Sequence, residues 1–136
     1  MTRINIIPPI ELTDQHLVAE YREIFMVGSA LQRSIVSKYG VDSTRISKNY
    51  TLNTGHVYFF YDKGKYLYKR YLLLIEEMKN RGMNVDKTRE FPKWKFPDEF
   101  FNDWIPSEDD FCVIRERISY RINQKPNWYR YYGTKI

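Results

Sequence analysis

Residues 1–25 read MTRINIIPPIELTDQHLVAEYREIF, and this stretch decides how the chain begins to fold. Proline lacks a backbone N–H and restrains the residue before it, so Pro8 and Pro9 should keep residues 3–12 extended. We expect that segment to be an arm laid across the body of the protein. The hydroxyl of Thr13 can cap a helix, so the first helix is predicted to begin directly after it.

The first helix is predicted to span residues 14–38 and to end before Gly40, since glycine favours the end of a helix. Apolar residues recur along it at spacings of four and three, the pattern of a helix that faces a core. They are Leu17, Tyr21, Ile24, Gly28, Leu31 and Ile35.

Two further helices are predicted along the chain. The second spans about residues 63–81, ends at Gly82 and presents the apolar face Leu67, Tyr71, Leu74 and Met78. The third begins at residues 107–110, where Ser-Glu-Asp-Asp forms a capping box with acids at the positive end of the helix. It should continue to about Gln124 and be closed by Pro126.

The segments between the helices are less regular. Residues 57–61, Val-Tyr-Phe-Phe-Tyr, are so rich in β-branched and aromatic side chains that their composition alone predicts a strand. Residues 83–106 are predicted to be a long loop that exposes Trp94 and Trp104 and contains a short helical turn near residues 97–100.

Composition favours a single domain that meets a polyanion. The chain has 136 residues and a net charge of +5, and 17% of its residues are aromatic. Cationic groups meet phosphates and flat rings stack on bases, so this mixture is typical of a nucleic-acid surface. The single cysteine, Cys112, excludes an internal disulfide and a cysteine-rich zinc site. With neither a signal peptide nor an apolar run that spans a bilayer, we expect an intracellular protein away from membranes.

The solvent-facing side of the first helix gathers polar side chains. At about 100° per residue, Gln15 falls beside Arg22, and His16 falls beside Glu23. The simplest interpretation of such a face is that it is solvated, and lone histidines such as His16 and His56 are usually structural.

A second feature of the N-terminus suggests chemistry. The small residue Thr2 favours removal of Met1, which would expose the α-amine of Thr2. An α-amine titrates near pH 7.7–8 and a lysine near 10.4, so roughly a tenth of the α-amine is free base at neutral pH. Such an amine can attack an electrophilic sugar carbon without being buried.

Short motifs along the whole chain carry a resemblance. They are Met1–Asn5, Asp14–Leu17, Ala19–Glu23, Gly55–Val57, Phe59–Lys63, Lys69–Arg70, Arg81–Gly82, Ile105–Pro106, Pro126, Trp128–Tyr129 and Tyr131–Gly133. In these motifs the chain resembles the phage pyrimidine-dimer DNA glycosylase family, also called endonuclease V. The resemblance implies an all-α, compact single domain over residues 1–136, with three main helices, long irregular loops and an extended N-terminal arm. It also implies irregular coil, packed under helices, for residues 57–61.

The resemblance implies a DNA glycosylase with abasic-site lyase activity and neither metal nor cofactor. In the family, the α-amine attacks the anomeric carbon of the damaged nucleotide, displaces the base and forms an imine, and β-elimination then cuts the strand. Thr2 would supply the amine, and Glu23 would stabilise the sugar cation and move protons. The positions implied in DNA binding are Arg3, Gln15, His16, Arg22, Met26, Arg117, Arg121, Trp128 and Arg130.

The partner implied is duplex DNA with damaged pyrimidines, above all the cyclobutane pyrimidine dimer, bound by a monomer in the cytoplasm of the host cell. One departure leaves the substrate open, because the family has an arginine where this chain has Met26. The alternatives are the same chemistry on another damaged or modified pyrimidine, and a basic DNA-binding module without catalysis.

Overall fold

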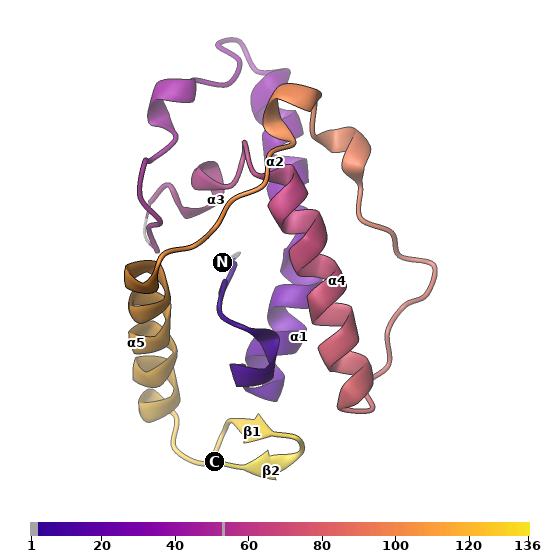
Figure 1. Ribbon diagram of the computed structural model, residues 1–136, viewed down its shortest axis with the longest axis vertical. Coiled ribbons are helices and arrows are strands. Elements are labelled where there is room, and N and C mark those ends of the chain that lie inside the picture. The colour runs from indigo at the N-terminus through magenta and orange to yellow at the C-terminus, as the bar shows by residue number, and fades with distance from the viewer. Residues whose placement is uncertain (1–2, 53) are drawn as a thin grey trace.

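The computed structural model describes residues 3–52 and 54–136, and it confirms the all-α class (Figure 1). Its α-helices are α1 (Asp14–Glu23), α2 (Phe25–Ile35), α3 (His56–Phe59), α4 (Gly64–Asn80) and α5 (Glu108–Gln124). Its 3-10 turns are η1 (Pro9–Glu11), η2 (Ser43–Arg45), η3 (Lys93–Lys95) and η4 (Asp98–Phe100). The tail forms a small antiparallel hairpin of β1 (Arg130–Tyr131) and β2 (Thr134–Lys135).

The first predicted helix is present as two helices in series. The hydroxyl of Thr13 accepts the backbone N–H of His16 at 3.1 Å and caps α1, as predicted. Only Ile24 separates α1 from α2, and its φ of −58° and ψ of −30° are helical, so the axis continues. The run ends at Ile35 and not at residue 38. Beyond it the Ser37 backbone N–H donates to the Ser34 carbonyl at 3.2 Å in a tighter turn, and the Ser37 hydroxyl donates to the same carbonyl. The predicted apolar stripe faces the core, with Ile35 only partly buried.

The second predicted helix, α4, lies across α1 and carries much of the core (Figure 1). Seven of its residues are buried: Gly64, Leu67, Arg70, Tyr71, Leu74, Glu77 and Met78. Its start requires a glycine, since a Cβ at Gly64 would come within 2.7 Å of the Phe96 ring. Two of the seven, Arg70 and Glu77, are charged, which the apolar pattern does not explain.

The third predicted helix, α5, begins at Ser107 with the predicted capping box. The Ser107 hydroxyl accepts the Asp110 N–H at 3.2 Å, and the Asp110 carboxylate accepts the Ser107 N–H at 2.9 Å. Only Ile114 and Ile118 of this helix are buried, so α5 presents a narrow apolar edge to the body. It stands beside the arm in Figure 1, and the hairpin that follows it lies at the end of α1.

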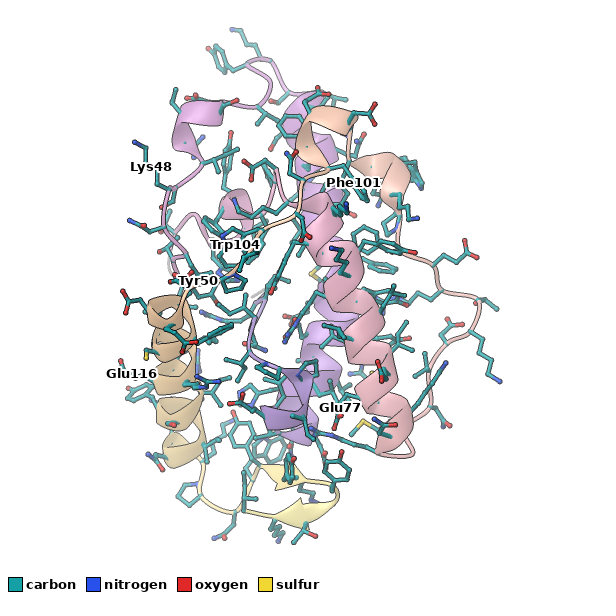
Figure 2. The ribbon with its side chains drawn as sticks, viewed as in Figure 1. Lys48, Tyr50, Glu77, Phe101, Trp104 and Glu116 are labelled. Atoms are coloured by element: carbon teal, nitrogen blue, oxygen red, sulfur yellow. The ribbon has the colours of Figure 1, made fainter. Side chains whose placement is uncertain are left out.

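The aromatic run from residue 57 to 61 begins as a helix, because residues 57–59 belong to α3. The strand predicted from composition and the irregular coil implied by the resemblance are therefore both wrong for these three residues. Gly55, at a φ of 97°, starts this short helix, and burial of Phe59, Phe60 and Tyr61 explains the aromatic composition. Trp104, predicted to be exposed, is partly buried here and stacks on Tyr50 with ring centroids 6.1 Å apart (Figure 2). Trp94 is exposed as predicted, and η4 supplies the predicted turn.

Much of the N-terminal arm, residues 3–12, is buried, and the arm is not simply extended. Ile4, Ile6, Ile7 and Leu12 all belong to the core. Their apolar side chains outweigh the effect of the prolines, and Pro9 instead opens the turn η1. Ile6 has a φ of 48°, a left-handed conformation that β-branched residues rarely adopt.

Within the described ranges, the structure contains no helix that is both long and apolar enough to cross a bilayer.

Candidate active site

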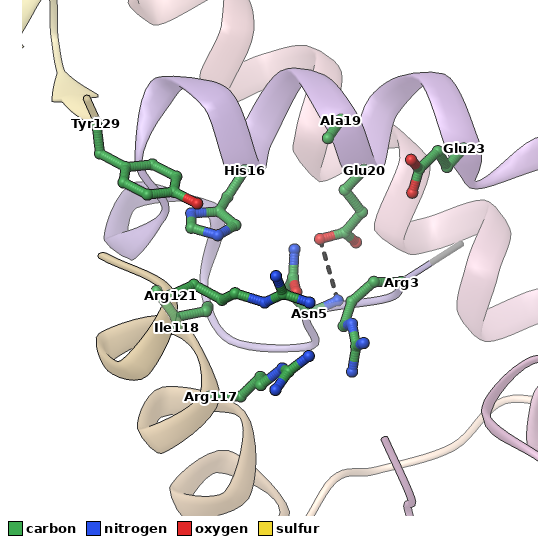
Figure 3. Close-up of a pocket in the computed structure, with 10 residues that line it drawn as sticks. All are labelled: Arg3, Asn5, His16, Ala19, Glu20, Glu23, Arg117, Ile118, Arg121 and Tyr129. Carbon is green, nitrogen blue, oxygen red and sulfur yellow. Dashed lines mark hydrogen bonds between the residues drawn. The ribbon is translucent and has the colours of Figure 1, made fainter. Parts of the chain in front are cut away.

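A cavity of about 210 Å³ lies where the arm, α1 and α5 meet (Figure 3). Its walls are Arg3 and Asn5 of the arm, His16, Ala19, Glu20 and Glu23 of α1, Arg117, Ile118 and Arg121 of α5, and Tyr129 of the tail. Five of the predicted site residues therefore come together in one pocket, although they are spread over most of the chain.

The start of the arm is held by two side chains from the middle of the chain. The Ile4 N–H donates to Nε2 of His56 at 2.9 Å, and the Tyr50 hydroxyl donates to the Ile4 carbonyl at 2.8 Å. Because Nε2 accepts, the His56 proton sits on Nδ1, which donates to the Thr51 carbonyl at 2.7 Å. Burial lowers the pKa of His56 to about 4, so the ring is neutral at physiological pH, as this contact requires.

Below this point, a buried ion pair fixes the arm to α1 and α4. Arg70 donates to Glu20 through Nε at 2.7 Å and Nη2 at 3.0 Å, and the two side chains are 2% and 0% exposed. The pair also forms hydrogen bonds with the backbone of the arm. Glu20 accepts the Asn5 N–H at 3.1 Å, and Nη1 of Arg70 donates to the Ile7 carbonyl. These bonds flank Ile6 on both sides and hold its left-handed backbone in place.

Cations crowd the pocket. Burial, and then the nearby Arg117, lower the pKa of the Arg3 guanidinium. Burial, and then Arg121, lower the pKa of His16 to about 4. Where neighbouring cations disfavour the positive charge of a side chain, a bound anion would offset their mutual repulsion. Glu23 lines this pocket, while the charge of Glu20 is neutralised by its buried partner.

His16 was predicted to lie on the solvent-facing side of the helix, but its side chain is partly buried. Its ring lies flat against Tyr129, with centroids 4.8 Å apart and planes 2° apart, and its Nδ1 is 2.7 Å from the Thr13 hydroxyl. The stack ties the tail to α1 and forms one end of the pocket (Figure 3).

Four more of the predicted residues, Gln15, Arg22, Trp128 and Arg130, line a second groove on α1. This groove is lined by Asp14, Gln15, Val18, Ala19 and Arg22 and by Asn127, Trp128, Arg130 and Lys135 of the tail. The Gln15 amide donates to the Trp128 carbonyl at 2.8 Å and accepts the Arg130 N–H at 2.9 Å, so it positions the tail. Ala19 lines both hollows and separates them.

Two predicted positions stand apart. Met26 lines neither hollow and is 52% exposed on α2. Thr2 lies outside the described residues, and Arg3, to which it is bonded, lines the pocket.

Sequence reasoning missed Glu20, Asn5 and Tyr129. A signal for Glu20 was available, because it falls three residues after Leu17 and four before Ile24, within the apolar stripe of the helix. Arg70 has the same relation to Leu67 and Leu74. A carboxylate and a guanidinium embedded in two apolar stripes indicate a buried pair, since buried charges are normally partnered.

Residues 3–52 and 54–136 contain no group of three histidine, cysteine or acidic side chains arranged to hold a metal ion.

The comparison with known families bears on the arm side of this site. The model of the pyrimidine dimer DNA glycosylase family matches residues 1–91. This part contains the arm, α1, α2 and α4, and with them Arg3, Glu20 and Glu23. The wall formed by α5 and the tail lies beyond the match and completes the same pocket. The match covers well over half of the sequence, and the chain therefore belongs to the pyrimidine dimer DNA glycosylase family.

Proposed function

We propose that this DNA glycosylase excises cyclobutane pyrimidine dimers through an imine with its own N-terminus and then cleaves the strand as a lyase. The observation that carries the proposal is the shared pocket of Arg3 and Glu23. The first described residue of the arm is thus brought to the carboxylate that would act with the α-amine of Thr2.

The steps balance without any group from outside the protein, apart from water. The unprotonated α-amine attacks the anomeric carbon, and the base leaves with the electron pair of the glycosidic bond. The amine loses one proton on forming its bond to carbon, and water carries a proton to the departing base. Ring opening gives the imine. Glu23 stabilises the cationic sugar before attack, and its carboxylate then accepts the proton from C2′ as the 3′ phosphate leaves. Water hydrolyses the imine and frees the amine.

The cationic wall supports this chemistry by its position. Arg117 and Arg121 project from α5 toward Arg3 and the Glu20–Asn5 contact (Figure 3). Phosphates bound there would hold the strand against the arm, and the neutral ring of His16 adds no positive charge to the pocket that Glu23 lines. We propose that residues 1–136 act as one unit, as a monomer on duplex DNA in the cytoplasm of the host cell.

Borohydride trapping tests the nucleophile. Reductant added during turnover on dimer-containing duplex should convert the imine to a stable protein–DNA adduct, and peptide mapping should place it on residue 2. Acetylating the terminus, or retaining Met1, should abolish the adduct and leave DNA binding intact. An adduct on a lysine, or full activity with a blocked terminus, would contradict the assignment, because lysines are largely protonated at neutral pH.

Glu23→Gln separates the carboxylate from the amine. The amine remains, so an adduct can still form, but base release and strand cleavage should fall about 10²- to 10⁴-fold. Glu116→Gln is the matched control, because Glu116 is exposed on α5 and lines neither hollow (Figure 2). Equal activity of the two variants would exclude a catalytic role for Glu23.

A further inference from the structure

The solvent face of the first helical run continues past the site toward the end of α2. Gln15, Arg22 and Ser29 are spaced seven residues apart, two helical turns, and therefore lie on one line. Arg33 follows one turn after Ser29. From Arg22 to Arg33 this line is about 16 Å long, at 1.5 Å per residue. Its first part borders the groove lined by Trp128 and Arg130.

Lys95, from a distant part of the chain, is fixed on this line. Its backbone carbonyl accepts the Gln32 amide at 2.8 Å, and its ammonium donates to the Ser29 hydroxyl at 2.8 Å. Gly28 makes room for it, since a Cβ there would lie 3.4 Å from the Lys95 stem and 3.1 Å from Phe96. Two hydrogen bonds and a close backbone approach thus hold one cation at a defined place on α2.

No carboxylate among residues 3–52 and 54–136 forms an ion pair with Lys95. The structure records no ion pair for Lys95, Arg22 or Arg33 across the described residues, whereas Arg70 and Arg81 each bind carboxylates. The recorded partners of the Lys95 ammonium are the Ser29 hydroxyl and the ring of Trp94, whose centroid lies 5.4 Å away. Neither partner carries a charge, so the ammonium keeps its full charge. Trp94, next to it on η3, is 75% exposed.

We propose that the DNA interface extends along α2 and that Lys95 contacts a backbone phosphate of the duplex beyond the damaged site. The inference rests on the proposed function, because it takes the pocket and the tail groove as the face that meets DNA. A line of cations along a straight helix fits a duplex, which presents one phosphate per 3.4 Å of axis on each strand. The contact is to the backbone, so it carries no information on sequence or lesion.

Lys95→Gln and Lys93→Gln form a matched pair of variants. Both residues belong to η3 and both changes remove one charge, but the Lys93 ammonium lies 4.0 Å from the centre of the Tyr68 ring, against α4. Binding to damaged and undamaged duplex is measured by fluorescence anisotropy across a salt series. We expect Lys95→Gln to weaken both equally, by roughly three- to tenfold at low salt, and to lower the slope of log K against log salt by about 0.9. Lys93→Gln should match the wild type.

Two further results make the outcome decisive. Lys95→Met keeps the apolar stem against Gly28 and removes the charge. If the ammonium binds DNA, this variant should bind as weakly as Lys95→Gln. Thermal melting checks that each variant is folded. Lys95→Arg should restore the slope. Equal binding by the Lys95→Gln and Lys93→Gln variants, with normal wild-type binding, overturns this inference alone. A wild type that does not bind duplex DNA overturns the proposed function as well.

Discussion

His56 holds the arm only while its ring is neutral, because Nε2 accepts the Ile4 N–H. Its pKa is about 4 in the folded protein and near 6.5 when unfolded. As the pH falls below 6.5, His56 is protonated in the unfolded chain before it is protonated in the folded protein. The contribution of His56 to the free energy of unfolding is therefore fully present above pH 6.5 and decreases toward pH 4. We expect this histidine to remove on the order of 3 kcal/mol from the free energy of unfolding across that range.

Urea denaturation at several pH values measures the effect, with His56→Gln as the comparison. The glutamine amide can still accept from Ile4 and has no proton to gain, so the variant should lose less stability between pH 6.5 and pH 4. Because the pKa of His16 is lowered as well, only the difference between the two proteins reports on His56. Parallel curves would show that His56 does not couple the arm to pH.

We expect the side chain at position 26, in the first turn of α2, to affect how strongly this surface attracts DNA. The side chain is 52% exposed, so an arginine there would remain solvated and cost little stability. We expect Met26→Arg to tighten binding and raise the rate of dimer excision, measured by steady-state kinetics on dimer-containing duplex. A large loss of activity would instead indicate a surface adapted to another modified pyrimidine.

The pair Glu20–Arg70 joins three elements, the arm, α1 and α4, at one buried point. Glu20→Gln leaves the guanidinium buried and unneutralised, and we expect it to destabilise the protein by about 3–5 kcal/mol in chemical denaturation. Replacing both partners by apolar residues should not restore stability, because the Asn5 N–H and the Ile7 carbonyl would lose their partners. Full recovery in the double variant would show that the pair does not anchor the arm.

The helices were predictable because each follows from local chemistry: a cap at Thr13, a stripe with the helical period, a capping box at Ser107. The burial of the arm was not predictable. Its prolines indicate that the backbone is restrained, but they do not indicate what the isoleucine side chains contact. The short helix α3 was missed because β propensity measures fit to a half-buried surface, which an aromatic core also provides.

The site was predictable only in part. Helical angles brought His16 and Glu23 together, but the stack of His16 on Tyr129 joins positions 113 residues apart and leaves no local pattern. The buried role of Glu20 depends in the same way on the crossing of α1 and α4. Contacts between distant elements are set by the whole fold, so residues that serve them escape a search along the chain.

Affinity for DNA should be a property of the entire positive surface. The net charge is +5, and Arg117 faces the pocket without an ion pair among the described residues. We expect Arg117→Ala to weaken binding to damaged and undamaged duplex alike and to reduce the salt dependence, measured by anisotropy. Arg115→Ala is the control on the same helix, because Arg115 is paired with Glu11 at 2.8 Å. Affinity that does not change with salt, or an Arg117 effect confined to damaged DNA, would contradict this view.

The three tryptophans lie in different surroundings, so intrinsic fluorescence can follow the arm and DNA binding separately. Trp104 is partly buried and stacks on Tyr50, whose hydroxyl binds the arm, so its emission should lie at short wavelength and follow the arm. Trp128, 56% exposed, lines the tail groove that we propose meets DNA, and Trp94, 75% exposed, lies with its ring 5.4 Å from the Lys95 ammonium. Indole emission moves to longer wavelength in water. Quenching of the long-wavelength edge would then record binding, while movement of the short-wavelength edge would record release of the arm.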